Sequence, residues 1–356
     1  MNTDQAPRWL PSPLVPFFTL SYPTAPPAHP DSFPTSNYYG TGLLDGCMVI
    51  TAIAVMAVLR DMTRIYVMEP FARWKLGRDL RLSKQRMAAL ANGNGKANGH
   101  ANGHANGNGH AQHANGSAIS RQEAKKMQRS VIRFAEQGWS VVYYLAQMAF
   151  GLYIHTHLPT AVLNPINVWH GYPHIPLAGP VKFYYLLEVA FYLHQILVIN
   201  AEAPRKDHWQ MLTHHIITVV LMIGSYFYNY NRIGCLIMVL MDWCDIFLPL
   251  AKMFKYLGMA TLCDVTFVVF LLSWFITRHV LFLLAIKATW ESWYVVPRIW
   301  DPSRGHYMTK EIYIGFFGML VTMQIIQLAW FWMICRVAWK VVSGQNAEDT
   351  RSDEEE

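Results

Sequence analysis

Two neighbouring apolar stretches each carry a pair of ionisable side chains that membrane segments seldom contain. The first holds His214 and His215, and the second holds Asp242 and Asp245. An aspartate at the centre of a membrane span costs about 2.5–3.5 kcal/mol on insertion scales. The two aspartates therefore need compensation from other parts of the fold. Ionisable groups in such positions usually face a bundle interior or a wet cavity and mark a functional site.

The spacing of these residues favours one shared cavity. Asp242 and Asp245 are three positions apart and share one face of a helix, which Pro249 and Lys252 continue. Neighbouring positions on a helix point about 100° apart. One histidine is therefore expected to face the cavity and the other a neighbouring helix. A stripe of similar spacing on the first stretch consists of His214, Thr218, Leu221 and Ser225.

Imidazole next to carboxylate is suited to acyl transfer. Histidine accepts and returns a proton near neutral pH. A buried carboxylate on the other ring nitrogen fixes the tautomer and stabilises the charged ring. Histidine also attacks activated acyl groups to give an acyl-imidazole. The set thus predicts acyl transfer from a thioester to an amine or alcohol within the bilayer. The alternative is that the four side chains only join helices through hydrogen bonds.

The elements that position these residues are expected to be membrane helices. The chain has 356 residues, of which 53% are hydrophobic and only 15% charged, whereas soluble domains are about 25% charged. A span needs about 20 mostly apolar residues. Stretches of that kind predict an all-α polytopic membrane protein with about seven transmembrane helices. They are residues 43–60, 139–158, 181–200, 211–228, 233–257, 263–287 and 311–338.

Basic residues predict the orientation of the spans. Between Arg60 and Arg133 the chain has fourteen basic and four acidic residues, and cytosolic loops carry such an excess. The N-terminus is then lumenal and the C-terminus cytosolic. The predicted order is a lumenal Pro-rich N-terminus (1–42), a first transmembrane anchor (43–60), a basic cytosolic loop (61–138), six transmembrane helices (139–338) and an acidic cytosolic tail (339–356).

The segments outside the spans carry weaker signals. Within the basic loop, residues 91–117 consist mainly of Ala, Asn, Gly and His and predict a flexible spacer. Its flanks, 60–86 and 119–133, are expected to form basic amphipathic helices. Ser352 precedes four acidic residues and resembles a site for an acidophilic kinase, although a charged solubilising tail is the alternative. The five cysteines lie in or beside apolar stretches, so no disulfide framework is expected.

The polar residues between 205 and 256 resemble those of the TLC-domain ceramide synthases, the longevity-assurance type of sphingoid-base N-acyltransferase. Met241 stands where many animal members have histidine, as in fungal-like members, so no role is assigned to it. The resemblance covers 120–340. It rests on Arg205, Lys206, Asp207, Met211, His214, His215, Thr218, Ser225, Tyr226, Asn229, Arg232, Ile233, Gly234, Asp242, Asp245, Lys252 and Tyr256.

The resemblance implies an enzyme of the endoplasmic reticulum membrane. It would transfer a fatty acyl group from acyl-CoA to the amine of dihydrosphingosine or phytosphingosine, giving (dihydro)ceramide. Residues 139–338 would be the TLC domain, with six helices forming a barrel around an intramembrane site. Acyl-CoA is the co-substrate, and no cofactor or metal is expected. Membrane lipids are expected partners, a dimer or a small accessory subunit stays open, and no nucleic acid is expected.

The resemblance also implies roles for individual residues. His214 and His215 are the catalytic pair, supported by Asp242 and Asp245. Substrate-binding roles go to Arg205, Lys206, Asp207, Ser225, Asn229, Arg232 and Lys252. Basic residues at the cytosolic mouth would attract the phosphates of CoA. Acyl-histidine formation and direct attack both stay open, and we favour the first.

Two other functions are weighed against this one. The main alternative is a non-catalytic TLC-domain protein that senses lipid or assists translocation. A metal hydroxylase is not expected, because the histidines outside 91–117 form no HxxHH-like repeats.

Overall fold

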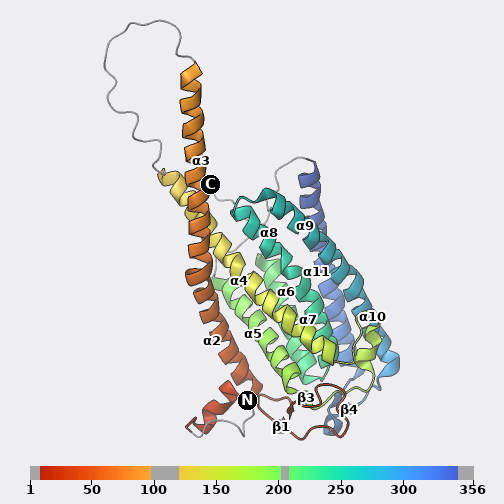
Figure 1. Cartoon of the computed structure of the whole chain (residues 1–356). Coiled ribbons are helices and arrows are strands. Elements are labelled where there is room, and N and C mark those ends of the chain that lie inside the picture. Colours follow the sequence, from red (N-terminus) through yellow and green to blue (C-terminus); the bar gives the residue numbers. More distant parts are fainter. Residues whose placement is uncertain (1–8, 98–119, 202–207, 344–356) are drawn as a thin grey trace, which may run out of the picture. The chain divides into compact units, whose positions relative to one another are not determined.

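Helices dominate the computed structural model, which describes residues 9–97, 120–201 and 208–343 (Figure 1). The α-helices are α1 (Val15–Phe18), α2 (Asp45–Met62), α3 (Glu69–Ala97), α4 (Arg121–His157), α5 (Gly179–Ala201), α6 (His208–Phe227), α7 (Asn231–Asp245), α8 (Phe247–Tyr256), α9 (Ala260–Trp274), α10 (Phe282–Val295) and α11 (Lys310–Val342). Short helical turns are η2 (Ser12–Leu14), η4 (Pro165–Trp169) and η6 (Pro302–Arg304), and two segments are π-helical, η3 (Thr63–Met68) and η5 (Phe275–Leu281).

The strands are short and lie outside the long helices. They are β1 (Pro23–Thr24), β2 (Tyr38–Tyr39), β3 (Leu177–Ala178), β4 (Trp300–Asp301) and β5 (His306–Tyr307). The first three form an antiparallel sheet in the order β1-β2-β3, and β4 pairs with β5. The register between β2 and β3 places Tyr38 opposite Ala178. This sheet therefore joins the N-terminal segment to the start of α5.

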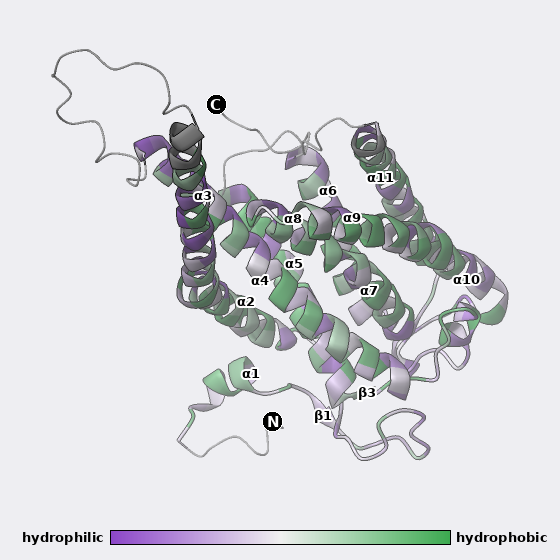
Figure 2. Ribbon diagram, turned by 45° about the horizontal axis from the view of Figure 1, so that its top comes forward, coloured by the Kyte–Doolittle hydropathy of each residue, from purple (hydrophilic) through white to green (hydrophobic). Residues whose placement is uncertain are grey.

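Six helical segments of the described chain are long and apolar enough to cross a membrane. They are Asp45–Leu90, Gly179–Ala201, His208–Phe227, Asn231–Tyr256, Ala260–Val295 and Lys310–Lys340. Figure 2 shows how hydropathy differs between helices: α9, α10 and α11 are mainly green (hydrophobic), whereas α3 has many purple (hydrophilic) residues. The prediction of an all-α polytopic membrane protein is confirmed.

The predicted span 139–158 differs from the other six. It lies within α4, a helix of 37 residues, but α4 is not among the segments that meet the criteria for a span. Tyr143, Tyr144 and Gln147 lower the hydropathy of this stretch. The count of seven spans is therefore reduced to six by length and composition, although the helix itself is present.

The first span also differs in extent from its prediction. Helix α2 passes without a loop through the π-helical η3 into α3, which continues to Ala97. Residues 91–97, predicted to belong to a flexible spacer, are thus helical, and the rest of that low-complexity segment lies outside the described residues. The helices predicted in the flanks of the spacer, 60–86 and 119–133, are confirmed.

The chain divides into two units. One consists of residues 1–59, 142–248 and 267–356, and the other of 60–141 and 249–266. In the second unit, α3 and the first part of α4 carry a small core of Ala72, Val131, Phe134 and Leu257. An ion pair of 2.8 Å between Lys84 Nζ and Glu123 Oε2 also joins these two helices. The first unit contains the main hydrophobic core, between α6, α7, α10, α11 and η4.

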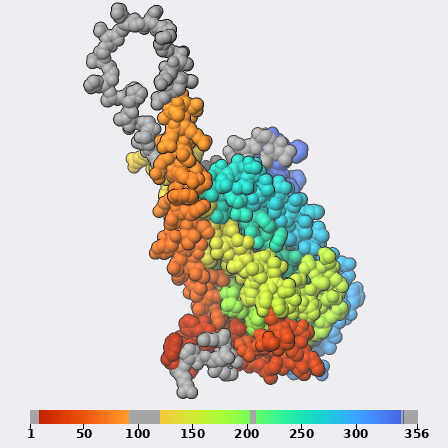
Figure 3. Space-filling model, viewed as in Figure 1, coloured from red at the N-terminus to blue at the C-terminus, as the bar shows by residue number. Residues whose placement is uncertain are grey.

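The N-terminal segment of the first unit is anchored by a buried lysine of α5. Lys182 Nζ lies 2.7 Å from Asp45 Oδ1 and donates to the carbonyl oxygens of Ser21 (2.8 Å) and Gly40 (2.7 Å). Asp45 Oδ2 accepts a 2.7 Å hydrogen bond from Tyr226 Oη of α6. The red-coloured N-terminal residues cover one end of the helices in Figure 3. The Pro-rich N-terminus is thus a packed part of the fold.

Helix α7 ends four residues before a proline. Pro249 lacks a backbone N–H and its ring clashes with the carbonyl four residues earlier, which belongs to Asp245. The helix is interrupted at Ile246, and α8 begins at Phe247 with Pro249 in its first turn. The break places Asp245 at the last position of α7.

Candidate active site

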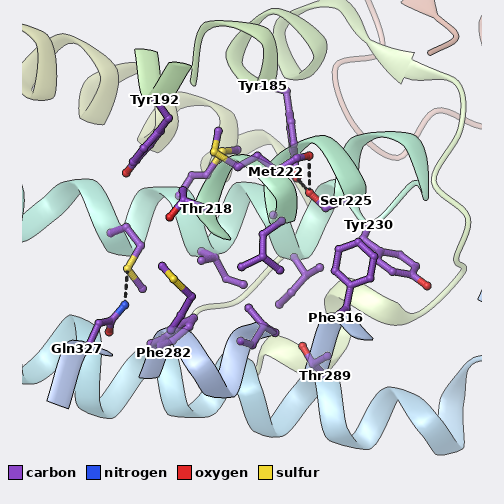
Figure 4. A pocket seen from close by; sticks show the side chains of 18 of the residues that line it. Tyr185, Tyr192, Thr218, Met222, Ser225, Tyr230, Phe282, Thr289, Phe316 and Gln327 are labelled. Carbon is purple, nitrogen blue, oxygen red and sulfur yellow. Dashed lines mark hydrogen bonds between the residues drawn. The ribbon is translucent and has the colours of Figure 1, made fainter. Parts of the chain in front are cut away.

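A cavity lies between the helices of the first unit (Figure 4). Four segments line it over matching lengths, with the first and last lining residues eleven positions apart: His214 to Ser225 on α6, Tyr230 (directly before α7) to Met241 on α7, Arg278 to Thr289 on η5 and α10, and Phe316 to Gln327 on α11. Helix α5 also lines it, with Tyr185 and Tyr192. Most of the lining between these limits is Leu, Ile, Met and Phe. The cavity is therefore an elongated apolar compartment.

Its two ends differ in chemistry. At the end that we call the reactive end lie His214, Met241, Arg278 and Gln327. Met241 links two of them, because its carbonyl accepts from Arg278 Nη2 (2.8 Å) and its Sδ accepts from Gln327 Nε2 (3.3 Å). At the other end, which we call the aromatic end, lie Trp169, Ser225, Tyr230, Thr289 and Phe316.

The two adjacent histidines of α6 face different surroundings. His214 lines the cavity, with its ring centroid 5.0 Å from that of Trp330. Its Nδ1 is buried and has no hydrogen-bond partner among the described residues. His215 instead contacts the Tyr192 ring of α5. The prediction that one histidine faces a cavity and the other a helix is confirmed, and the other members of the α6 stripe, Thr218, Leu221 and Ser225, also line the cavity.

The hydrogen bond of His215 fixes its tautomer. Nδ1 lies 2.7 Å from the carbonyl oxygen of Met211. A carbonyl only accepts, so this nitrogen carries the hydrogen of a neutral ring. The Nε2 of neutral His215 then has a free lone pair and is available as a proton acceptor.

Arg278 is a residue of the site that sequence reasoning missed. It lies in the π-helical η5, lines the cavity and is almost completely buried. Its Nη2 lies 2.8 Å from Asp245 Oδ1, and its guanidinium stacks 4.6 Å from the Trp274 ring centroid. An arginine within the apolar stretch 263–287 costs about as much on insertion as the aspartates do, and that signal was present in the sequence.

The two aspartates have partners other than histidine. Asp245 pairs with Arg278, while the buried Asp242 faces Glu188 of α5, within hydrogen-bonding reach. Glu188 is completely buried, and Tyr143 Oη lies 3.5 Å from its Oε2. Among the described residues, no hydrogen bond joins Asp242 or Asp245 to either catalytic-candidate histidine. Glu188 was also missed, although it interrupts the apolar stretch 181–200.

The residues predicted to bind substrate lie in three places. Ser225 lines the cavity, and its Oγ is 2.6 Å from Tyr185 Oη (Figure 4). Asn229, at φ 61°, donates to the Gly305 carbonyl (2.8 Å), and Arg232 pairs with Asp31. Both residues therefore contact loops outside the cavity, and neither lines it. Lys252 belongs to the second unit. Arg205, Lys206, Asp207 and Ser352 lie outside the described residues.

In the ranges that the structure describes, no group of three or more His, Cys, Asp or Glu side chains is arranged to hold a metal ion. The titratable groups near the cavity instead form pairs: two histidines, two carboxyl groups, and an arginine with an aspartate. This arrangement can bind and move protons and can stabilise one negative charge beside a long apolar space.

Comparison with known proteins identifies a family and several relatives. The sequence model of one protein family, the TLC domain, matches residues 133–336. A sphingosine N-acyltransferase-like protein of Alternaria alternata is 37% identical over 64% of this chain and 59% of its own length. A sphingosine N-acyltransferase of Schizosaccharomyces pombe is 40% identical over 63% and 58%. A ceramide synthase of Gibberella moniliformis is 30% identical over 90% and 70%.

The chain thus spans a little under three fifths of the length of the first two relatives. The matched segment contains the cavity, both histidines and the residues that contact them. On this basis, the chain belongs to the TLC-domain family.

Proposed function

We propose that this protein is a ceramide synthase that transfers a fatty acyl group from acyl-CoA to the amine of a sphingoid base. The observation that carries the proposal is a histidine, His214, at one end of an apolar cavity of lipid dimensions. The names of the relatives agree with this reaction. The acyl donor is already activated as a thioester, so the protein need only supply a nucleophile, a proton acceptor and a site for the chain.

His214 is the proposed nucleophile. A ring nitrogen attacks the thioester carbonyl carbon, the carbon–sulfur bond breaks, and the electron pair leaves with the CoA sulfur. The proton of the resulting imidazolium passes to the thiolate, which leaves an acyl-imidazole and free CoA. The positive charge of Arg278, at the same end of the cavity, stabilises the oxyanion that develops on the carbonyl.

His215 is the proposed base. The sphingoid base arrives as an ammonium ion and must lose a proton before it attacks, and Nε2 of His215 is free to accept it. The neutral amine then attacks the acyl carbon. One of its two remaining protons goes to the leaving imidazole, which regenerates His214 and releases the amide. His215 then releases the proton that it accepted to water, and both imidazoles are neutral again. Asp245 acts through Arg278, and Asp242 through Glu188, so both are positioning residues in this scheme.

The setting of the reaction follows from the substrates. We place the protein in the endoplasmic reticulum membrane, with the N-terminus lumenal and the C-terminus cytosolic. The strongly basic segment 60–133 supports a cytosolic position for this part of the chain, and the orientation requires α4 to cross the membrane as a seventh helix. CoA carries several phosphates, and Arg205, Lys206 and Lys252 are the proposed attractants for them on the cytosolic side. No cofactor is required beyond the co-substrate acyl-CoA.

Microsomes containing the protein test the proposal directly. We expect N-acylation of a sphingoid base from acyl-CoA, and loss of that activity to background in His214→Ala. His215→Ala should reduce the rate by roughly 10²–10⁴, the usual contribution of a general base. His170→Ala, which removes an exposed imidazole from a loop, is the matched control. Normal turnover in His214→Ala, or no N-acyl product from the unaltered protein, would contradict the proposal.

A further inference from the structure

The length of the cavity can be measured along its walls. Each of the four lining segments extends over eleven residue steps, and a helix rises 1.5 Å per residue, which gives about 16 Å. The same number of steps on these four segments gives the cavity one length along four of its walls, while α5 lines it only with Tyr185 and Tyr192. It runs from His214 at the reactive end to Phe316 at the aromatic end.

This length corresponds to a definite number of carbon atoms. An extended polypeptide advances 3.3–3.6 Å for every three bonds, or about 1.2 Å per bond, and an extended alkyl chain is similar. The cavity therefore accommodates about 14 carbon–carbon bonds. A 16-carbon acyl chain attached at His214 matches this, whereas a 26-carbon chain would extend roughly 30 Å.

Aromatic rings form the wall at the far end. The ring of Tyr230 lies 4.9 Å from that of Phe316 and 5.2 Å from that of Trp169, both in edge-to-face contact. Trp169 and Tyr230 are buried. These two rings also line a second, smaller space, which lies next to the cavity. The end of the cavity is thus set by side chains and not by backbone.

We propose that the cavity selects the acyl chain by length, that it favours acyl-CoAs of about 16–18 carbons, and that Phe316 is a specificity-determining residue at its end. The proposal rests on the proposed function, because an acyl group carried by His214 has its tail in this compartment. The sphingoid base then approaches the reactive end from outside the cavity.

The first test is a product profile with acyl-CoAs of even length from about 10 to 26 carbons, one sphingoid base being held constant. We expect the maximum at 16–18 carbons. Phe316→Ala should lengthen the space and raise the product from 20–24-carbon donors by at least fivefold relative to the 16-carbon product. A maximum at 24–26 carbons in the unaltered protein would overturn the length assignment.

Phe317→Ala is the matched control for this variant. Phe317 is the same residue type, is similarly half-buried and follows directly on α11, but its ring contacts Trp290 and Tyr313 and does not line the cavity. Its product profile should stay that of the unaltered protein. A shift in Phe317→Ala equal to that in Phe316→Ala would show that loosened packing, and not cavity length, sets the profile.

A variant in the opposite direction keeps the proposal testable if Phe316→Ala fails to fold. Leu320 lines the cavity one helical turn from Phe316, so a ring at this position blocks about 6 Å, or about five carbons. Leu320→Phe should move the maximum to 12–14 carbons. An unchanged profile would overturn the proposal.

Two further outcomes distinguish a failure of this proposal from a failure of the proposed ceramide synthase function. If no donor of any length is used, the ceramide synthase function itself fails. If Phe316→Ala changes the preferred length of the sphingoid base while the acyl profile is unchanged, the cavity holds the base, and the assignment of the acyl chain is overturned with the function intact.

Discussion

Two buried clusters of ionisable groups in the same unit are built in opposite ways. Around Lys182, three oxygens lie within 2.8 Å of Nζ, one for each ammonium hydrogen. Asp45 pairs with this ammonium group and accepts a hydrogen bond from a tyrosine hydroxyl. Around Glu188, one carboxyl group faces another, and the oxygens of Asp242 have no hydrogen-bond donor among the described residues other than that carboxyl group. The first cluster is satisfied and the second is not.

This difference indicates which cluster stabilises the fold and which one has another use. A buried polar group is usually fully hydrogen-bonded, and one that is not requires an explanation. The lysine cluster joins α5, α6 and the N-terminal segment, as a structural element should. One member of the carboxyl pair, Asp242 of α7, directly follows Met241, which lines the reactive end. The carboxyl pair is thus next to the candidate active site in the chain.

The largest effect is expected from Lys182→Met. Removal of the ammonium leaves Asp45 as a buried charge without a cation, a change that costs about 3–5 kcal/mol. The variant should lose most of its folded protein, measured by thermal unfolding in detergent and by the yield of monodisperse material. The double variant Lys182→Met with Asp45→Asn should recover a substantial part of the stability, because no unpaired charge is left. Equal instability of the single and double variants would contradict the assignment of an ion pair.

A smaller effect on stability is expected from Glu188→Gln. Two carboxyl groups in contact cannot both be ionised at low cost, so one of them carries a proton, and a neutral amide is a close substitute for it. Stability should change by no more than about 1.5 kcal/mol, the size of one ordinary hydrogen bond. If the pair positions the reactive end, the acylation rate of the folded variant should fall although its stability is nearly unchanged. A loss of 3–5 kcal/mol would mean that this cluster is as structural as that of Lys182.

Some features of the fold and of the site could be predicted from the sequence, and others could not. The α6 stripe and the divergent directions of His214 and His215 were predictable, because they depend only on helix periodicity. The break between α7 and α8 also has a local cause, Pro249, although 233–257 was predicted as one stretch. Six of the spans followed from hydropathy alone. Within the candidate site, sequence thus located the helix faces correctly.

Partners across helices were not predictable. Arg278, Glu188 and Lys182 are visible as charged interruptions in apolar stretches, but the residue that each one meets depends on which helices pack together. Asp245 meets Arg278 across 33 positions, and Asp45 meets Lys182 across 137. Periodicity contains no information on such distant pairs. The expected contact of aspartate with histidine was therefore the part of the site for which sequence gave the least support.

The smallest effect is expected at the surface, where Asp31 pairs with Arg232 near His174. Partial burial raises the pKa of Asp31, but hydrogen bonding to Arg232 and its charge outweigh this and hold that pKa below its usual value. Burial and the charge of Arg232 lower the pKa of His174 to about 4. Both shifts favour the folded form at high pH, since each folded-state pKa lies below the unfolded one. For His174 this stabilisation is complete above about pH 6.5 and is lost as the pH falls toward 4.

Because these groups are partly exposed and screened by solvent, their combined effect should stay below about 1 kcal/mol. That corresponds to a fall of at most roughly 2–4 °C in Tm between pH 7 and pH 5, measured by thermal unfolding in one detergent. His174→Asn should remove most of the fall, while His170→Ala, an exposed histidine of the same loop, should not. The same substitutions should leave acylation at pH 7 unchanged, because neither imidazole lines the cavity. A pH dependence that persists in His174→Asn would instead locate the titrating group in one of the buried clusters, and the contrast between a satisfied and an unsatisfied cluster would then have to include their protonation near neutral pH.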